Sequence, residues 1–301
     1  MGDYPLAAWR LLRSAPAGGA VNMAVDEAIL RAVAAGQVPP TLRLYAWEPP
    51  SLSLGRGQPL ADVDLQAVRA AGFGLVRRPT GGKAILHVDE LTYSVVAPEA
   101  EPRVAGDIVE SYRRLSAGLV CGLERLGVTG LVADRRVAPL LIGGAGGDVG
   151  DRRLDGPVCF EVPSDYEITV GGRKLVGSAQ MRAQGVVLQH GTLPLYGDIT
   201  RICPLLTARP DPARVRVRAT TVEEALGPFG SASTVPFDKL RAGAQGKRPV
   251  TWNEAADAVA AGFAEALNLR LEPGTLTDEE CAWAEELRAQ KYATQEWTHR
   301  V

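Results

Sequence analysis

The chain has few of the residues that build disulfide frameworks or metal sites. Its 301 residues include four cysteines and three histidines. The cysteines, at positions 121, 159, 203 and 281, lie far apart, and none forms a Cys-x-x-Cys pair. Disulfide scaffolds and zinc sites need more of these residues at closer spacing. We therefore expect neither a disulfide framework nor a bound metal.

Long apolar runs and a large excess of one charge are also missing. No apolar segment reaches the roughly 18 residues of a membrane span, and the N-terminus lacks the apolar centre of a signal peptide. The net charge is −2 and the isoelectric point is near 6.0, so the chain has no general attraction for nucleic acid or anionic membranes. The sequence predicts a cytoplasmic protein that binds neither.

Length and composition predict one enzyme-sized domain. With 46% hydrophobic residues the chain can bury one large core, so we expect a single domain over residues 1–301 with its core at about 38–270. Residues 227–249 are rich in glycine, serine and proline, which indicates a flexible insertion. The glycine-rich run at 141–153 lacks the Gly-Lys-Ser/Thr ending of a phosphate-binding loop.

Strand and helix signals alternate without the regular order of a doubly wound sheet. Asn22 is a candidate cap for a first helix, and residues 107–126 carry apolar side chains at helical spacing. We expect three capping boxes, at Thr220/Glu223, Thr251/Glu254 and Thr277/Glu280. The expected strands are 9–12, 41–47, 51–54, 73–76 and 84–86. Together these signals predict an α+β fold, a mixed and largely antiparallel sheet flanked by helices, with a helical C-terminal end.

One cysteine precedes a lysine that a predicted hairpin holds in place. Residues 166–170 alternate apolar and polar, Gly171-Gly172 suits a two-residue turn, and 173–176 begin the return strand. Lys174 follows the turn, and Cys159 lies fifteen residues before it. A nearby ammonium lowers the pKa of a thiol, and a thiolate can attack a thioester and hold its acyl group. The alternative is a buried structural cysteine with a surface lysine.

A diglycine lies between two predicted strands. Gly81 and Gly82 lack a Cβ, so their backbone can approach a ligand closely and present N–H groups to it. His87 follows shortly after, and His190 precedes Gly191. Since an imidazole titrates near neutral pH, each histidine is either a general base or a hydrogen-bonded part of a pocket wall.

Several segments together resemble the lipoyl and biotinyl protein ligase superfamily. The run RRPTGGKAILH at 77–87 is similar to the signature of lipoate-protein ligases, and residues 173–193 are similar to the segment that carries the lysine of that family. Further similarity at 21–30, 42–59 and 291–300 extends the resemblance over most of the chain. The resemblance implies a fold of the lipoate and biotin protein ligase type.

The residues at 158–160, Val-Cys-Phe, stand where ATP-dependent ligases of this superfamily usually have a polar pair such as Asn-Asp. This version resembles octanoyltransferases of lipoate biosynthesis, which move octanoyl from acyl carrier protein to the glycine cleavage H protein. The resemblance implies that Cys159 carries the acyl thioester and that Lys174 lowers the pKa of its thiol. It implies octanoyl-acyl carrier protein and the H protein, or another lipoyl domain, as partners. No cofactor is expected, because the incoming thioester is already activated.

By matching position, the resemblance also places residues at the substrate. They are Arg78, Thr80, Gly81, Gly82, His87, His190 and Gly191. For Arg77 and Arg78 the alternative is ordinary surface charge. An apolar pocket is expected for the acyl chain, because each buried CH₂ contributes about 0.8 kcal/mol. Leu52, Leu54 and Leu86 are candidates for it, but we favour ordinary core packing as the interpretation of each.

Two other functions remain open at this point. In an ATP-dependent lipoate or octanoate ligase, Lys174 would bind the acyl-adenylate and Cys159 would take no part. In a non-catalytic subunit of a split ligase, the chain would only bind the carrier domain. The Cys-Phe pair argues against the ligase, and the retention of both Cys159 and Lys174 argues against the subunit.

Overall fold

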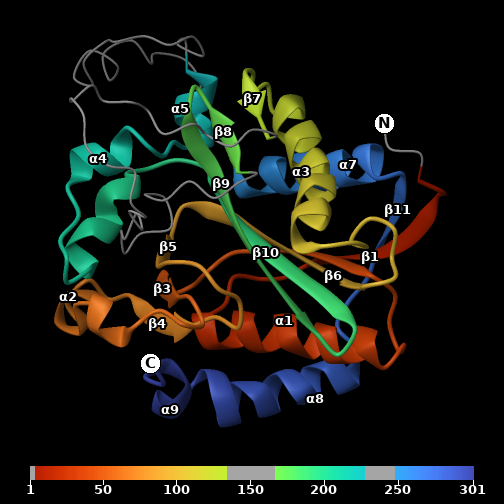
Figure 1. The fold of residues 1–301 in the computed structure, drawn as a ribbon, viewed down its shortest axis with the longest axis horizontal. Coiled ribbons are helices and arrows are strands. Elements are labelled where there is room, and N and C mark those ends of the chain that lie inside the picture. The colour runs from red at the N-terminus through yellow and green to blue at the C-terminus, as the bar shows by residue number, and fades with distance from the viewer. Residues whose placement is uncertain (1–3, 134–166, 228–247) are drawn as a thin grey trace, which may run out of the picture.

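A large mixed sheet forms the centre of the molecule. The computed structural model describes residues 4–133, 167–227 and 248–301. The strands of this sheet are β1 (Ala7–Arg13), β2 (Thr41–Tyr45), β6 (Glu90–Pro98), β7 (Leu131–Val132), β8 (Ile168–Val170), β9 (Arg173–Ala183), β10 (Val186–Pro194) and β11 (Leu269–Pro273). They lie in the order β11-β1-β2-β6-β10-β9-β8-β7 (Figure 1). Because β1 pairs with β11, the sheet extends past both ends of the range 38–270.

The pairing confirms the predicted sheet type. β1 is parallel to both β11 and β2, and the other neighbouring pairs of the large sheet are antiparallel. A smaller sheet, in the order β4-β3-β5, consists of β3 (Ser51–Leu54), β4 (Gly74–Arg77) and β5 (Ile85–His87). Its strands flank the diglycine, as the sequence predicts.

Helices cover both faces of the large sheet, and the C-terminal end is helical as predicted. The helices are α1 (Gly19–Ala34), α2 (Leu65–Ala70), α3 (Ile108–Arg125), α4 (Pro212–Arg216), α5 (Val222–Leu226), α7 (Trp252–Ala266), α8 (Asp278–Leu287) and α9 (Gln295–Thr298), with short turns η1 (Leu60–Asp62), η2 (Ile199–Leu205) and η3 (Arg288–Tyr292). Helices α3 and α7 pack on one face through an apolar cluster that includes Tyr93, Leu119 and Phe263. Helix α1 covers the other face and lies between the sheet and α8 (Figure 1). No helix in the described ranges is both long and apolar enough to cross a membrane.

Local signals placed several elements correctly. Asp107 caps α3 in a reciprocal capping box with Glu110, and the boxes at Thr251 and Thr277 are also present. Gly171 and Gly172 have φ of +56° and +77°, the conformation that a tight two-residue hairpin turn requires. The predicted helix at 107–126 and the hairpin before Lys174 are therefore confirmed.

Two predicted caps are wrong, and tertiary contacts explain both. Helix α1 begins at Gly19, so Asn22 lies inside it and donates instead to the carbonyl oxygens of Ala17 and Ala46. Thr221, not Thr220, caps α5. The backbone N–H of Thr220 bonds to the carbonyl oxygen of Lys174 at 2.9 Å, which holds Thr220 outside the helix and delays its start by one residue.

The contact between α3 and α7 depends on small residues at the crossing. A Cβ added to Gly262 would lie 2.2 Å from the backbone nitrogen of Gly122 and 2.4 Å from the carbonyl oxygen of Gly118. Both obstacles are helix backbone, so neither can move aside cheaply. The glycines let the two helices approach closely above the sheet.

We expect Gly262→Ala to lower the free energy of unfolding by about 1–3 kcal/mol, the usual cost of overpacking, although alanine favours a helix. Gly57→Ala is the matched control, because no atom lies within 4 Å of its added Cβ. Urea denaturation of both variants measures the difference. Equal stability of the two variants would show that the helices separate without cost.

Candidate active site

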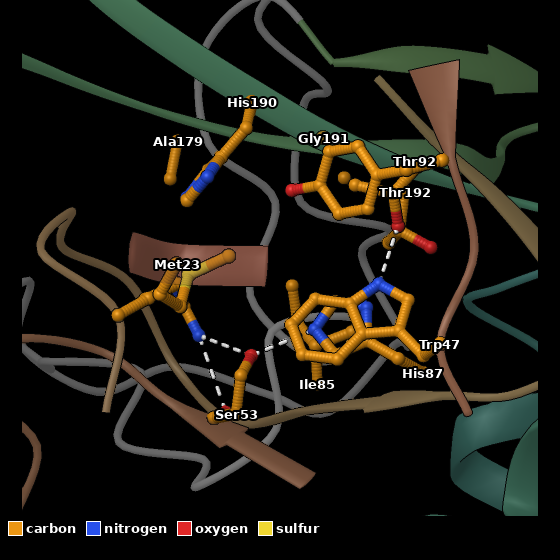
Figure 2. A pocket seen from close by; sticks show the side chains of 13 residues that line it. Met23, Trp47, Ser53, Ile85, His87, Thr92, Ala179, His190, Gly191 and Thr192 are labelled. Carbon is orange, nitrogen blue, oxygen red and sulfur yellow. Dashed lines mark hydrogen bonds between the residues drawn. The ribbon is translucent and has the colours of Figure 1, made fainter. Parts of the chain in front are cut away.

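A cavity lies where the large sheet, the small sheet and α1 meet (Figure 2). Its walls come from segments far apart in the sequence. The lining residues are Met23, Tyr45, Trp47, Ser53, Arg78, Ile85, His87, Thr92, Gly177, Ala179, His190, Gly191 and Thr192. Four predicted substrate residues are thus brought together here, namely Arg78, His87, His190 and Gly191. Leu52 and Leu54 pack in the core of the small sheet, in agreement with the core reading, and the half-buried Leu86 borders a neighbouring recess.

Arg78 holds the diglycine turn through hydrogen bonds to its backbone. Its guanidinium donates to the carbonyl oxygens of Gly81 and Lys83, both at 2.8 Å, and to Ser53 Oγ at 3.1 Å. Since the C=O and N–H groups of a trans peptide point in opposite directions, the N–H of Gly82 faces away from Arg78. The turn therefore presents a backbone donor at an exposed position, where Gly82 has a φ of +93°.

Arg77 supports the same turn from behind. It donates to the carbonyl oxygens of Gly55 and Thr298, both at 2.8 Å, and so joins the loop after β3 to α9. The loop is in close contact with the turn, since a Cβ on Gly55 would lie 1.9 Å from the carbonyl oxygen of Gly82. Arg77 and Arg78 are only 0% and 3% exposed, so the surface-charge alternative is wrong for both.

A buried chain of hydrogen bonds connects the turn to α1. Thr80 Oγ1 lies 2.7 Å from His190 Nε2, and His190 Nδ1 lies 3.3 Å from Asp26 Oδ2. Burial lowers the pKa of His190, and the charges of Arg78 and His87 act in the same direction against the opposing effect of Asp26. A neutral imidazole that donates from Nδ1 to the carboxylate accepts the Thr80 hydroxyl at Nε2. His190 therefore positions Thr80.

Asp26 is the charged end of this chain. Arg43 donates to its Oδ1 at 2.7 Å, Ser94 donates to the same oxygen at 2.9 Å, and Tyr45 donates to Oδ2 at 2.9 Å. Burial alone would raise the pKa of Asp26, but the Arg43 charge and the contacts with His190 outweigh it and lower the pKa. The carboxylate stays ionised within the protein.

A second histidine is fixed on the opposite wall. The ring of His87 stacks on the indole of Trp47 (Figure 2), and the two ring centroids are 3.8 Å apart. His87 Nε2 lies 2.8 Å from Ser53 Oγ, and Nδ1 lies 2.9 Å from Glu90 Oε1. Glu90 also accepts the hydroxyl groups of Thr92 and Thr192.

The polar groups of the cavity wall therefore bond mainly to one another. Hydroxyls and imidazoles that pair within the wall no longer require water, and Met23, Trp47, Ile85 and Ala179 add apolar surface. Such a lining suits an alkyl chain, in which each buried CH₂ contributes about 0.8 kcal/mol.

Lys174 is not among the lining residues of the cavity, but a register shift places it on the face of β9 that two of them share. Thr169 pairs with Lys174 and Ile168 pairs with Val176, so Leu175 is an extra residue in the ladder. Leu175 and Val176 both pack in the core under α3 and α7. Alternation then resumes, which places Lys174 on the same face as Gly177 and Ala179. Lys174 is 4% exposed, and its Nζ donates to Glu167 in a buried ion pair.

Cys159, the predicted nucleophile, lies outside the described residues.

Sequence reasoning missed three carboxylates that hold predicted residues in place: Asp26 at His190, Glu90 at His87 and Glu167 at Lys174. Asp26 and His190 are 164 positions apart, and no local pattern marks them as partners. Glu90 follows His87 by three residues, a spacing that offered a usable signal.

Comparison with known proteins identifies relatives along the whole chain. The family model described as the Lipoyl protein ligase A/B catalytic domain matches residues 19–263. A protein of Kyrpidia tusciae named octanoyltransferase LipM is 46% identical over 298 residues, with 97% of this chain and 98% of that protein covered. One of the same name from Symbiobacterium thermophilum is 44% identical over 303 residues, with 97% and 98% covered.

Solved structures of the same type share the fold. A lipoate-protein ligase A crystallised with ATP is 26% identical and has a TM-score of 0.70, with 97% of this chain and 98% of that chain covered. A putative lipoate protein ligase from T. acidophilum with bound lipoic acid is 25% identical and has a TM-score of 0.69, with 99% and 100% covered. The described sheets and flanking helices therefore belong to the ligase-type fold that the sequence predicted.

The pKa of His190 is open to direct measurement. We expect its imidazole to titrate below 6.5 in the folded protein, because burial disfavours the charged form. As the pH falls below 6.5, the unfolded chain takes up this proton before the folded protein does. The free energy of unfolding therefore decreases in that pH range, by at most about 1.4 kcal/mol per pH unit. NMR titration gives the pKa, and His190→Gln assigns the signal. A pKa of 6.5 or higher would show that Asp26 outweighs burial and that the imidazolium form is favoured in the folded protein.

Proposed function

Because the chain belongs to the Lipoyl protein ligase A/B catalytic-domain family, we propose that it transfers an octanoyl group from octanoyl-acyl carrier protein to a lysine of a lipoyl domain, such as that of the H protein. The enzyme is an octanoyltransferase, because relatives that align with it over nearly their whole length carry that name. We place this reaction in lipoate biosynthesis in the cytoplasm. The observation that carries the mechanism is the buried Lys174 on the cavity face of β9.

Two acyl transfers make up the proposed reaction. The Cys159 thiolate attacks the carrier thioester, a new C–S bond forms, and the carrier thiolate leaves with the electron pair of the old one. The neutral amine of the acceptor lysine then attacks the enzyme thioester, an amide bond forms, the Cys159 thiolate leaves, and the amine proton passes to solvent. Each tetrahedral intermediate carries an oxyanion, which a preorganised N–H donor stabilises. The Gly82 N–H is our candidate for this donor.

The roles of the other residues follow from their contacts. The Lys174 ammonium favours the thiolate form of Cys159, while Glu167 holds that ammonium in place. Arg78 and the chain from Thr80 to His190 fix the diglycine turn. His87, stacked on Trp47, and Gly191 form the walls that enclose the acyl chain.

The acyl-enzyme is the first thing to test. After incubation with octanoyl-acyl carrier protein and no ATP, we expect the intact mass to rise by one octanoyl group, which apo H protein then removes. Cys159→Ala should gain no mass, whereas Cys281→Ala, at an exposed cysteine, should behave as the wild type. An alanine variant with full transfer activity would overturn the thioester mechanism. Activity only with ATP and free lipoate or octanoate would instead identify a ligase, and carrier binding without transfer a non-catalytic subunit.

The second test concerns the ion pair beside the thiol. Lys174→Ala should move the pH profile of iodoacetamide alkylation at Cys159 to higher pH, because the thiolate loses its neighbouring cation. Glu167→Gln should move it to lower pH, because an anion that competes for the Lys174 ammonium is removed while its shape is kept. The rate of alkylation as a function of pH is measured for the wild type and both variants. If the three profiles coincide, Lys174 does not lower the pKa of the Cys159 thiol.

A further inference from the structure

A second recess adjoins the acyl cavity and shares Trp47 with it. Its lining includes three carboxylates, Glu48, Asp89 and Glu90, and no lysine, arginine or histidine. Asp89 is paired with Arg201 at 2.5 Å, and Glu90 accepts hydrogen bonds within the cavity wall. Glu48 is exposed, and its carboxylate has no hydrogen bond or ion pair within the described part of the chain. The recess is therefore unsuited to an anion and attractive to a cation.

Aromatic side chains complete the recess. Trp47, Tyr196 and Trp252 lie in its lining, and Tyr196 is 37% exposed. The indole N–H of Trp47 donates to Thr92 Oγ1 at 2.8 Å, and that of Trp252 donates to the carbonyl oxygen of Tyr45 at 3.3 Å. These bonds fix both indole rings. Aromatic surfaces beside a free carboxylate suit an ammonium on an alkyl stem, since the rings attract the cation and cover the methylenes.

The recess opens at the same end of the sheet as Lys174. The N–H of Thr220 bonds to the carbonyl oxygen of Lys174 at 2.9 Å, and the N–H of Glu223 bonds at 2.9 Å to that of Leu195, which lines the recess. Thr220 and Glu223 lie three residues apart at the start of α5, about one helical turn of roughly 5.4 Å. The backbones of Lys174 and Leu195 are therefore anchored to the same turn of the protein.

We propose that this recess binds the side chain of the acceptor lysine as it approaches the acyl group, with Glu48 facing the ammonium and Tyr196 its stem. The inference rests on the proposed transfer reaction and adds a binding site for its second substrate. It assigns no proton transfer to the recess, so the ammonium loses one proton to solvent before the neutral amine attacks the thioester. The acyl chain and the lysine would occupy separate sites that meet at Trp47.

The two half-reactions separate this site from the acyl site. Glu48→Gln removes the charge and keeps the shape, so we expect KM for apo H protein to rise about two- to fivefold, the range for one exposed charge contact. Acylation by octanoyl-acyl carrier protein, followed by intact mass, should stay within about twofold of the wild-type rate. Glu279→Gln is the matched control. Glu279 is exposed and bonds to Gln37 beyond the far end of the 16-residue α1, about 24 Å from the end near Trp47.

A second comparison tests for the lysine itself. Calorimetry compares apo H protein with a variant whose acceptor lysine is methionine, each against the wild type and Glu48→Gln. We expect the wild-type enzyme to bind apo H protein more tightly than the methionine variant of H protein. This difference in affinity, the lysine advantage, should be smaller for Glu48→Gln. Tyr196→Phe should keep the advantage and Tyr196→Ala should reduce it, because only the first retains the ring.

Defined outcomes would overturn the inference. An unchanged KM in Glu48→Gln, or an equal lysine advantage in the wild type and Glu48→Gln, would show that the recess does not receive the lysine. If Glu48→Gln slowed acylation of the enzyme as much as it weakens transfer to H protein, Glu48 would instead act on the carrier protein or the acyl group. Failure to form any acyl-enzyme would count against the proposed function itself, so the two failures are distinguishable.

Discussion

The arrangement of the site depends on one buried carboxylate. Asp26 on α1 accepts hydrogen bonds from Arg43 on β2, Ser94 on β6 and His190 on β10. An ionised group that is 0% exposed is tolerated only when its partners are all in place, so these strands and the helix must assemble with a single relative orientation. That orientation turns Met23 of α1 into the cavity and places His190 beneath Thr80.

The same network reaches the diglycine turn, which His190, Arg78 and Arg77 hold in place. His190 fixes Thr80 from the large sheet, Arg78 binds the carbonyl groups of the turn, and Arg77 ties the loop behind it to α9 near the C-terminus. Backbone donors stabilise a developing charge well only if they need no rearrangement during the reaction. The bonds of Arg78 supply that rigidity at Gly81 and Gly82, which are exposed and have no side chains of their own.

The sequence predicted what local interactions decide. The helix at 107–126, the glycine turn before Lys174 and the strands beside the diglycine were all found correctly, because a few neighbouring residues determine each. The motifs also pointed to Arg78, His87 and His190, which the structure places in the wall of one cavity. The capping signals failed at Asn22, whose side chain bonds to the carbonyl oxygen of Ala46, and at Thr220, whose backbone N–H bonds to that of Lys174. Contacts of this kind are absent from any local window of residues.

The position of Lys174 shows how much one residue of register decides. Under strict alternation Lys174 would share a face with Ser178 and Gln180, which bond to Tyr93 and to Ser111 of α3 on the opposite side of the sheet. The extra residue Leu175 reverses the alternation and turns Lys174 to the face of β9 that Gly177 and Ala179 share. The hairpin turn fixes where β9 starts but not this bulge, because a bulge depends on the partner strand β8 and on packing under α3. The sequence predicts a role for Lys174, whereas the face of the sheet on which Lys174 lies is a property of the folded protein.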